Sequence, residues 1–249
     1  MKKNTKNKLQ VFHTVDALNE SAAQLIIQVA TKSVAARGRF VLCLSGGKTP
    51  NELYTLLSTE PFRDLISWQK TFVFWSDERF VPANDERNNA YTACEALLSR
   101  VDLPRSNMFP VPVSLPPADS AKKYEETIRN FFGEETASFD LLLLGLGGNG
   151  HTASLFPGTE VLHEKSAWVK EVYIEDLAMY RITMTPLLIN KASNILFLVT
   201  GREKAGILKT IFTCTYLPDQ YPVQLIDPGE GELTWYADDA AASAIITAA

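Results

Sequence analysis

The chain has 249 residues, of which 46% are hydrophobic and 21% are charged, and its formal net charge is −5. These values are typical of a globular protein with a sizeable core. The acidic balance argues against nucleic-acid binding, and no apolar run reaches the ~18 residues that span a bilayer. The basic N-terminus is followed by no apolar signal segment, so we expect a cytoplasmic protein with no membrane partner.

The few cysteines and histidines favour no metal site. The three cysteines stand far apart with no CxxC pair, which predicts reduced thiols. The three histidines lack the spacing of a zinc motif. We therefore expect neither a metal nor a cofactor. We expect one domain over residues 1–249, with residues 1–8 as a frayed end.

In the first half of the chain, strands and helices alternate. Residues 15–37 carry a helical apolar stripe that Gly38 ends. A helix starting near 88 would be capped by Asn88 or Asn89. The predicted elements are a strand at 10–13, a helix at 15–37, strands at 40–44 and 71–75, a helix at 88–100, a proline-rich connection at 104–117 and a helix at 118–132.

The second half continues the alternation. Four leucines at 141–144 predict a strand buried on both faces. Further strands are predicted at 167–174, 181–185, 194–200 and 233–236, with helices at 186–192, from about 205 to 212 and at 238–248. Strands alternating with helices predict an α/β fold with a Rossmann-like, mostly parallel sheet and helices on both faces.

The strand at 40–44 runs directly into a glycine-rich turn. We expect Thr49 to cap the next helix, with Pro50 in its first turn and Glu52 completing a capping box. A helix start attracts anions, so the turn is either a phosphate site or a packing turn. Walker A and nucleophile-elbow motifs are excluded, because the required glycines are missing. The candidate phosphate-binding residues are Ser45, Gly46, Gly47, Lys48 and Thr49.

A second glycine turn follows the leucine strand and carries His151. It matches GxGxxG, but it lies past mid-chain and no acid is clearly placed ~20 residues later, so a dinucleotide site is disfavoured. His151 would lie at the carboxyl edge of the sheet, where ligands bind. A buried structural histidine is the alternative. The turn residues are Gly147, Gly148, Asn149 and Gly150.

Charged side chains recur at the same predicted edge. Asp77 and Arg79 directly follow the strand at 71–75, and Arg181 and Lys204 lie at later strand ends or helix starts. In an acidic chain this recurrence predicts a local positive pocket for a phosphate or carboxylate. With a single histidine and no metal set, the simplest chemistry is general acid–base catalysis on a small phosphorylated molecule.

Five segments together carry a family resemblance. They are LSGGKTP at 44–50, SDERFVP at 76–82, GNGHTASLFPG at 148–158, RITMT at 181–185 and the turn at 201–205. The chain resembles the 6-phosphogluconolactonases, within a wider group that includes glucosamine-6-phosphate deaminase. That family usually has an aspartate two residues before the histidine, and this chain has Asn149 there.

The resemblance implies hydrolysis of 6-phospho-D-glucono-1,5-lactone to 6-phospho-D-gluconate in the oxidative pentose phosphate pathway. His151 would be the base, with the turn at 45–49, Arg181 and Lys204 on the phosphate. Arg79 or the N–H groups of the turn at 147–150 would stabilise the oxyanion, and Asp77 would orient Arg79 or His151. We expect a monomer or weak homodimer.

Two other functions stay open. A deaminase needs a glutamate five residues past the histidine, where this chain has Phe156. A non-catalytic sugar-phosphate sensor commonly carries a DNA-binding module, and no spare basic segment is available for one.

Overall fold

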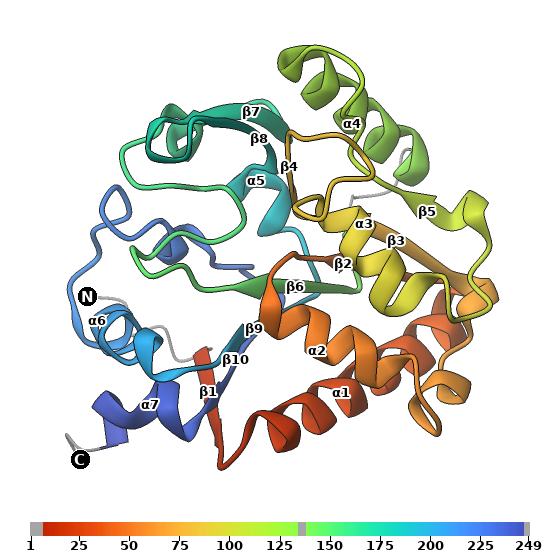
Figure 1. Ribbon diagram of the computed structural model, residues 1–249, viewed down its shortest axis with the longest axis horizontal. Helices are drawn as coiled ribbons and strands as arrows, with labels where there is room; N and C mark the ends of the chain where they lie inside the picture. Colours follow the sequence, from red (N-terminus) through yellow and green to blue (C-terminus); the bar gives the residue numbers. More distant parts are fainter. Residues whose placement is uncertain (1–6, 134–137, 247–249) are drawn as a thin grey trace.

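The computed structural model describes residues 7–133 and 138–246. Its centre is a seven-stranded sheet in which every neighbouring pair is parallel (Figure 1). This confirms the Rossmann-like α/β expectation. In spatial order the strands are β1 (Asn7–Phe12), β10 (Glu232–Asp238), β9 (Asn194–Val199), β6 (Leu141–Gly145), β2 (Phe40–Leu44), β3 (Thr71–Trp75) and β5 (Met108–Phe109).

Helices cover both faces of this sheet. In Figure 1, α1 and α2 lie below the central strands, and α4 and α5 lie above them. α1 has the predicted bounds, with Thr14 as its N-cap and Gly38 closing it at φ +73°. The helices are α1 (Val15–Arg37), α2 (Lys48–Leu57), α3 (Asn89–Ala93, continued by a π-turn over Cys94–Leu98), α4 (Pro117–Phe132), α5 (Pro186–Ile189), α6 (Ala205–Thr213) and α7 (Asp239–Ile246).

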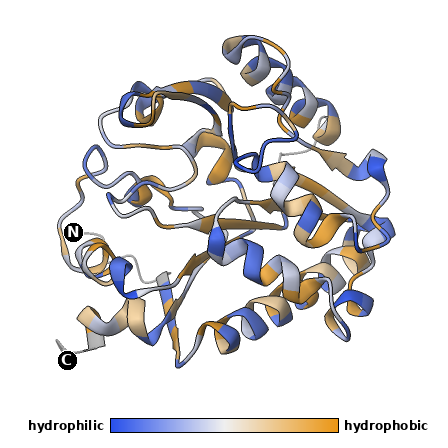
Figure 2. Ribbon diagram, viewed as in Figure 1, coloured by the Kyte–Doolittle hydropathy of each residue, from blue (hydrophilic) through white to orange (hydrophobic). Residues whose placement is uncertain are grey.

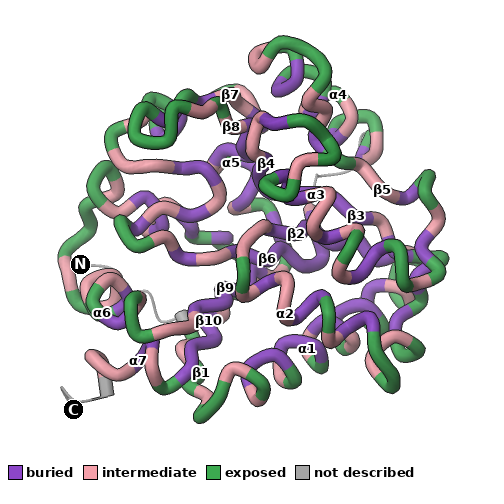
Figure 3. Tube along the Cα trace, viewed as in Figure 1, coloured by how far each residue is buried: buried purple, intermediate pink, exposed green. Residues whose placement is uncertain are grey.

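The core lies on the central strands. β2 is buried along its whole length, and so are the four leucines of β6. Figure 3 shows this burial as a continuous purple trace through the middle of the molecule. In Figure 2 the same strands are mostly hydrophobic, whereas hydrophilic residues gather on outer helix turns and loops. A strand covered by helices on both faces needs apolar residues on both, which explains the unbroken leucine run.

The chain reverses its direction across the sheet between β2 and β6. From β2 it proceeds to β3 and β5, whereas from β6 it proceeds to β9 and β10 on the other side. Such a reversal opens a crevice beyond the carboxyl ends of the two strands. The turn after β2 and the turn after β6 therefore face the same space.

Two predicted strands belong to a second sheet, which corrects the expected alternation. β7 (Val169–Ile174) and β8 (Met179–Met184) form an antiparallel hairpin, and β4 (Asp77–Arg79) pairs with β8. The four residues between β7 and β8 are too few for a parallel crossover, which needs about a dozen. Ala178 closes the hairpin at φ +46°.

Strand pairing also corrects two edges of the main sheet. Asn7 and Lys8 were predicted as frayed, but they pair with Leu233 and Thr234 of β10; residues 1–6 lie outside the described part. The proline-rich connection contains β5, where the Phe109 ring stacks 4.6 Å from that of Phe74. Short edge strands are held by one neighbour and a few side chains, so their own sequence carries little signal.

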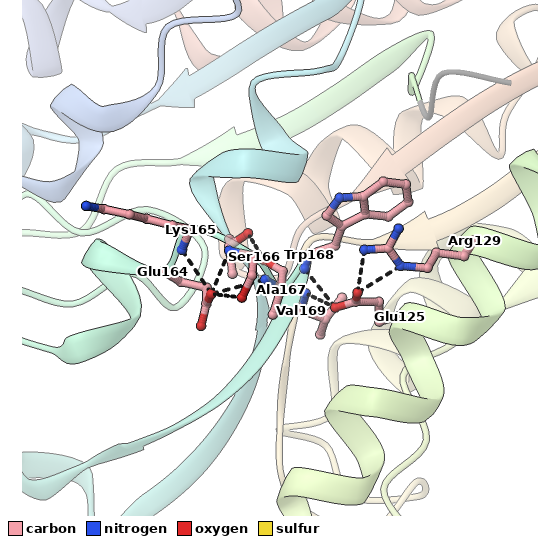
Figure 4. A network of polar contacts seen from close by, with 9 residues as sticks. Glu125, Arg129, Glu164, Lys165, Ser166, Ala167, Trp168 and Val169 are labelled. Carbon is pink, nitrogen blue, oxygen red and sulfur yellow. Dashed lines mark hydrogen bonds and ion pairs between the residues drawn. The ribbon is translucent and has the colours of Figure 1, made fainter. Parts of the chain in front are cut away.

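A polar clasp joins α4 to the start of β7 (Figure 4). Glu125 accepts hydrogen bonds from the N–H groups of Trp168 and Val169 at 2.7 and 3.1 Å. Its other oxygen binds Arg129, whose guanidinium lies 3.8 Å from the centre of the Trp168 ring. Beside it, Glu164 accepts three backbone N–H groups, which lower its pKa to about 2. The clasp holds the second sheet on the first.

Removal of the Glu125 carboxylate should destabilise the protein. Glu125→Ala leaves two N–H groups and Arg129 without their acceptor, so we expect a loss of about 2 kcal/mol in the free energy of unfolding. Glu126→Ala is the matched control, because Glu126 is 61% exposed and its partner on the helix surface is Lys123 at 3.2 Å; its effect should stay within about 0.5 kcal/mol. Urea unfolding measures both. Equal losses would show that the clasp carries no stability.

Candidate functional site

The crevice beyond β2 and β6 is a cavity of about 1020 Å³. The turns after β2, β6 and β9 line it together with β4 and the β7–β8 hairpin. It brings together almost all the residues singled out in the sequence. These are Ser45, Gly46, Gly47, Lys48, Thr49, Asp77, Arg79, Gly147, Gly148, Asn149, His151, Arg181 and Lys204. Gly150 lies outside this lining, with its Cα against Tyr221.

A tight backbone turn positions His151. The N–H of Gly147 donates to the His151 carbonyl at 2.8 Å, and the N–H of Gly150 donates to the Gly147 carbonyl at 3.0 Å. Gly150 adopts φ +84°, which favours glycine. A Cβ on Gly147 would overlap the His151 ring, whereas one on Gly148 would meet open space. The imidazole therefore requires a glycine at position 147, whereas position 148 has room for a larger side chain.

Asn149 holds the imidazole in one tautomer. Its Oδ1 lies 2.6 Å from Nδ1 of His151 and also accepts the His151 backbone N–H at 3.2 Å. An amide oxygen can only accept, so Nδ1 carries the proton and Nε2 keeps its lone pair. The ring of Phe156 stacks on the imidazole at 4.0 Å and 18°. The neutral Asn149 thereby supplies the orientation that a carboxylate could also give.

Burial and nearby cations keep the imidazole neutral. Burial is the largest cause that lowers the pKa of His151 to about 4; the positive charges of Lys204, Arg181 and Arg79 act in the same direction, and the charge of Asp77 opposes them. A charged imidazole loses hydration in such a place, which disfavours its protonated form. His151 is therefore an unprotonated base throughout the neutral pH range.

Asp77 is buried beside this ring and is held from two sides. Ser154 Oγ donates to its carboxylate at 2.6 Å. The side-chain amide of Asn89 donates to the Asp77 carbonyl at 2.9 Å and lies 3.5 Å from the carboxylate. Asp77 acts on His151 through its charge, which raises the pKa of the imidazole.

Two arginines stand directly opposite each other across the second sheet. Arg79 of β4 pairs with Arg181 of β8. Like charges in that position repel, and burial together with Arg79 lowers the pKa of Arg181. The buried Nε atoms of both side chains have no hydrogen-bond partner among the described residues. An anion between them would relieve the repulsion and satisfy these donors.

The glycine turn after β2 differs from its prediction in one respect. Thr49 was expected to cap α2, but the helix begins at Lys48 and its N-cap is Gly47, at φ +116° with no side-chain cap. Thr49 lies inside the first turn and its Oγ1 instead contacts Thr200 Oγ1 at 2.6 Å. The first amides of α2 thus remain open towards the cavity, as an anion site requires.

Lys48 and Lys204 line the same cavity as the start of α2. Lys48 is 90% exposed and lies 3.8 Å from Glu52. Lys204 ends a 3₁₀ turn after β9, where Gly201 adopts φ +98° and its N–H donates to Asp238 at 3.0 Å. Arg202, in the same 3₁₀ turn as Lys204, is exposed and lies outside the cavity lining.

Sequence inspection missed Asn89 and Ser154. Asn89 lines the cavity, fully packed between Asp77 and Gly46, and Ser154 holds the Asp77 carboxylate. Ser154 stands within the GHTASLFP motif, which offered a signal. Asn89 was considered as a helix cap alone, and that role belongs to Asn88, which accepts the N–H of Tyr91 at 2.9 Å.

Comparison with known proteins identifies the family. The family described as glucosamine-6-phosphate isomerases/6-phosphogluconolactonase matches residues 13–235. The 6-phosphogluconolactonase of Synechocystis sp. is 40% identical over 228 residues, covering 90% of this chain and 92% of that protein. The 6-phosphogluconolactonase from Trypanosoma cruzi superposes with a TM-score of 0.85 at 29% identity, covering 96% of each chain. The chain belongs to this family of enzymes.

In residues 7–133 and 138–246, no group of His, Cys, Asp and Glu is arranged to hold a metal ion. No helix in the same ranges is long and apolar enough to cross a membrane.

The ionisation of His151 can be measured directly. By histidine ring NMR we expect its pKa near 4 and the proton on Nδ1 at pH 7. Asn149→Asp places a carboxylate next to Nδ1 and should raise that pKa by about one to three pH units. His13 is the internal control, because Asp239 raises the pKa of its exposed ring. A wild-type His151 that titrates at its ordinary value would contradict this description of the site.

Proposed function

We propose that this enzyme hydrolyses 6-phospho-D-glucono-1,5-lactone to 6-phospho-D-gluconate, the lactone step of the oxidative pentose phosphate pathway. The observation that carries the proposal is a neutral imidazole, fixed through Nδ1 by Asn149, in a cavity lined by Arg79, Arg181 and Lys204. The relatives named 6-phosphogluconolactonase and the shared fold support the same reaction.

The proposed chemistry uses one proton shuttle. Nε2 of His151 takes a proton from water as the water oxygen bonds to the lactone carbonyl carbon. The tetrahedral intermediate then expels the ring oxygen, which receives that proton from His151. The new carboxylic acid ionises, and the imidazole returns neutral. A lactone is an activated ester, so no covalent enzyme intermediate is needed.

The proposed donors to the anions of the reaction come from the turns after β2, β6 and β9 and from strands β4 and β8. The open amides of α2 with Lys48, and Lys204 and Arg181, are placed for the phosphate. Arg79 or the N–H groups of the turn at 147–150 stabilise the oxyanion. Because Arg79 and Arg181 are direct cross-strand partners, a phosphate on Arg181 and an oxyanion on Arg79 would lie at neighbouring positions along one wall.

The deaminase alternative requires a proton relay that this site does not offer. The position five residues past His151 holds Phe156, whose ring covers one face of the imidazole. A phenyl ring cannot accept or donate the proton that an amine leaving group needs. We therefore expect no ammonia release from glucosamine 6-phosphate.

The activity test compares wild type with His151→Ala and Asp77→Ala. Lactone hydrolysis is followed by coupling to 6-phosphogluconate dehydrogenase, with an enzyme-free blank because the lactone hydrolyses spontaneously. Loss of the base should lower kcat by about 10²–10⁴-fold, and Asp77→Ala should lower it by about tenfold. Circular dichroism confirms folding. Full turnover in His151→Ala would refute the mechanism, and no turnover in wild type would refute the function.

A pair of neighbouring glycines tests the placement of the imidazole. Gly147→Ala drives a methyl group into the His151 ring, so we expect kcat/KM to fall by about 10²-fold through misplacement of the base. Gly148→Ala adds the same methyl group to open space and should stay within about threefold of wild type. The coupled assay measures both. Equal effects at the two positions would show that the ring position is not what matters.

A further inference from the structure

Glu78 stands between two residues of the site but faces the other way. Successive side chains on a strand point to opposite faces. On β4 this alternation puts Asp77 and Arg79 on the cavity wall, opposite Thr183 and Arg181, while Glu78 pairs with Ile182 on the far face. Its side chain is fully buried, with 0% exposure, and lies outside the cavity lining.

The buried carboxylate binds backbone amides. One oxygen accepts the N–H of Arg79 at 2.8 Å and of Asn89 at 2.7 Å, and the other accepts the N–H of Ala90 at 3.0 Å. The last two are the first amides of α3, and the next free one, on Tyr91, is bound by Asn88. A buried charge of this kind is tolerated because several donors replace its lost water.

Asn89 connects Glu78 to the residues of the cavity. With its backbone held by Glu78, the Asn89 amide donates to the Asp77 carbonyl, and its oxygen packs against Gly46 of the anion-binding turn. Arg79 is held at its own N–H, and its guanidinium donates to the Arg87 carbonyl at 2.8 Å. One carboxylate thus ties β4 and α3 into a fixed cavity wall.

We propose that Glu78 is a positioning residue for the reaction: its ionised carboxylate holds Arg79 and, through Asn89, Asp77 against the substrate. This inference rests on the proposed lactonase function. Glu78 touches no substrate, so it acts only through the residues that it holds. Protonation would put an O–H among N–H donors, remove an acceptor and loosen the wall.

A pH dependence follows. Burial raises the pKa of Glu78 to about 7, aided by the charge of Asp77 and opposed by its three amide donors. The other groups facing it are Arg79 on β4, Arg181 on β8 and Tyr124 on α4. His151 stays neutral down to about pH 4. A loss of activity as the pH falls below about 7 would therefore indicate protonation of Glu78 and not of His151.

The decisive experiment is kcat/KM for the lactone from pH 5 to 9 in wild type and Glu78→Gln. In wild type we expect a fall of about tenfold per pH unit below about 7. Glu78→Gln resembles the protonated form, so its kcat/KM at pH 8 should be at least about tenfold lower than that of wild type, and the decrease below pH 7 should be absent. The substrate phosphate also titrates, near pH 6, but a decrease in kcat/KM caused by the phosphate would persist in Glu78→Gln. Glu86→Gln, an exposed position between β4 and α3, should match wild type.

Each outcome decides something. An active wild type with the same acid limb and rate in Glu78→Gln overturns the inference alone. A wild type that does not hydrolyse the lactone overturns the proposed function and the inference with it. If circular dichroism shows Glu78→Gln unfolded, Asn89→Ala replaces it. That variant keeps the carboxylate, so kcat should fall while the acid limb stays at the wild-type pH; an unchanged kcat overturns the inference.

Discussion

The turns after β2 and β6 can meet because these strands are parallel neighbours whose carboxyl ends lie at the same edge of the sheet. Both strands are buried on both faces, and each fully buried leucine contributes about 2 kcal/mol. This apolar layer fixes where the backbone leaves the sheet. Beyond it the chain reverses its winding direction, and the space so created holds the two glycine turns. The apolar core thus sets the positions of the turns that carry the site residues.

Electrostatics gives the cavity two compatible properties. The cations that we propose bind the phosphate also disfavour a positive charge on His151, so the field expected to attract the substrate also keeps the imidazole unprotonated. Asn149 fits this arrangement because it orients the ring without adding negative charge. Asp77 opposes the field, and its own position depends on Ser154 and Asn89. The site is therefore one coupled charge system and not a lone histidine.

Much of the fold and of the candidate site could be predicted from the sequence, because these features depend on residues close together in the chain. The leucine run, the Gly38 stop and the glycine turn before His151 follow from periodicity and from the conformations that glycine permits. The family motifs identified most of the residues that line the cavity, and the role of each residue stays a prediction.

Other features depend on partners that are distant in the chain. Thr49 cannot reveal that it meets Thr200, and the three residues of β4 became a strand only by pairing with β8. Glu78 was overlooked for the same reason, since two of its three amide donors belong to a helix that starts eleven residues later. A strand of three residues inside a charged segment is too short to show the alternation of side chains between two faces, so it cannot be recognised without its partner strand.

The central claim is that the imidazole of His151 is the base, and chemical rescue tests it most directly. His151→Ala leaves a space between Asn149 and Phe156 that free imidazole can enter. We predict that added imidazole restores lactone hydrolysis in a saturable manner, above the rate that imidazole gives without enzyme. A His151→Ala enzyme that hydrolyses the lactone near the wild-type rate, with or without imidazole, would contradict the account.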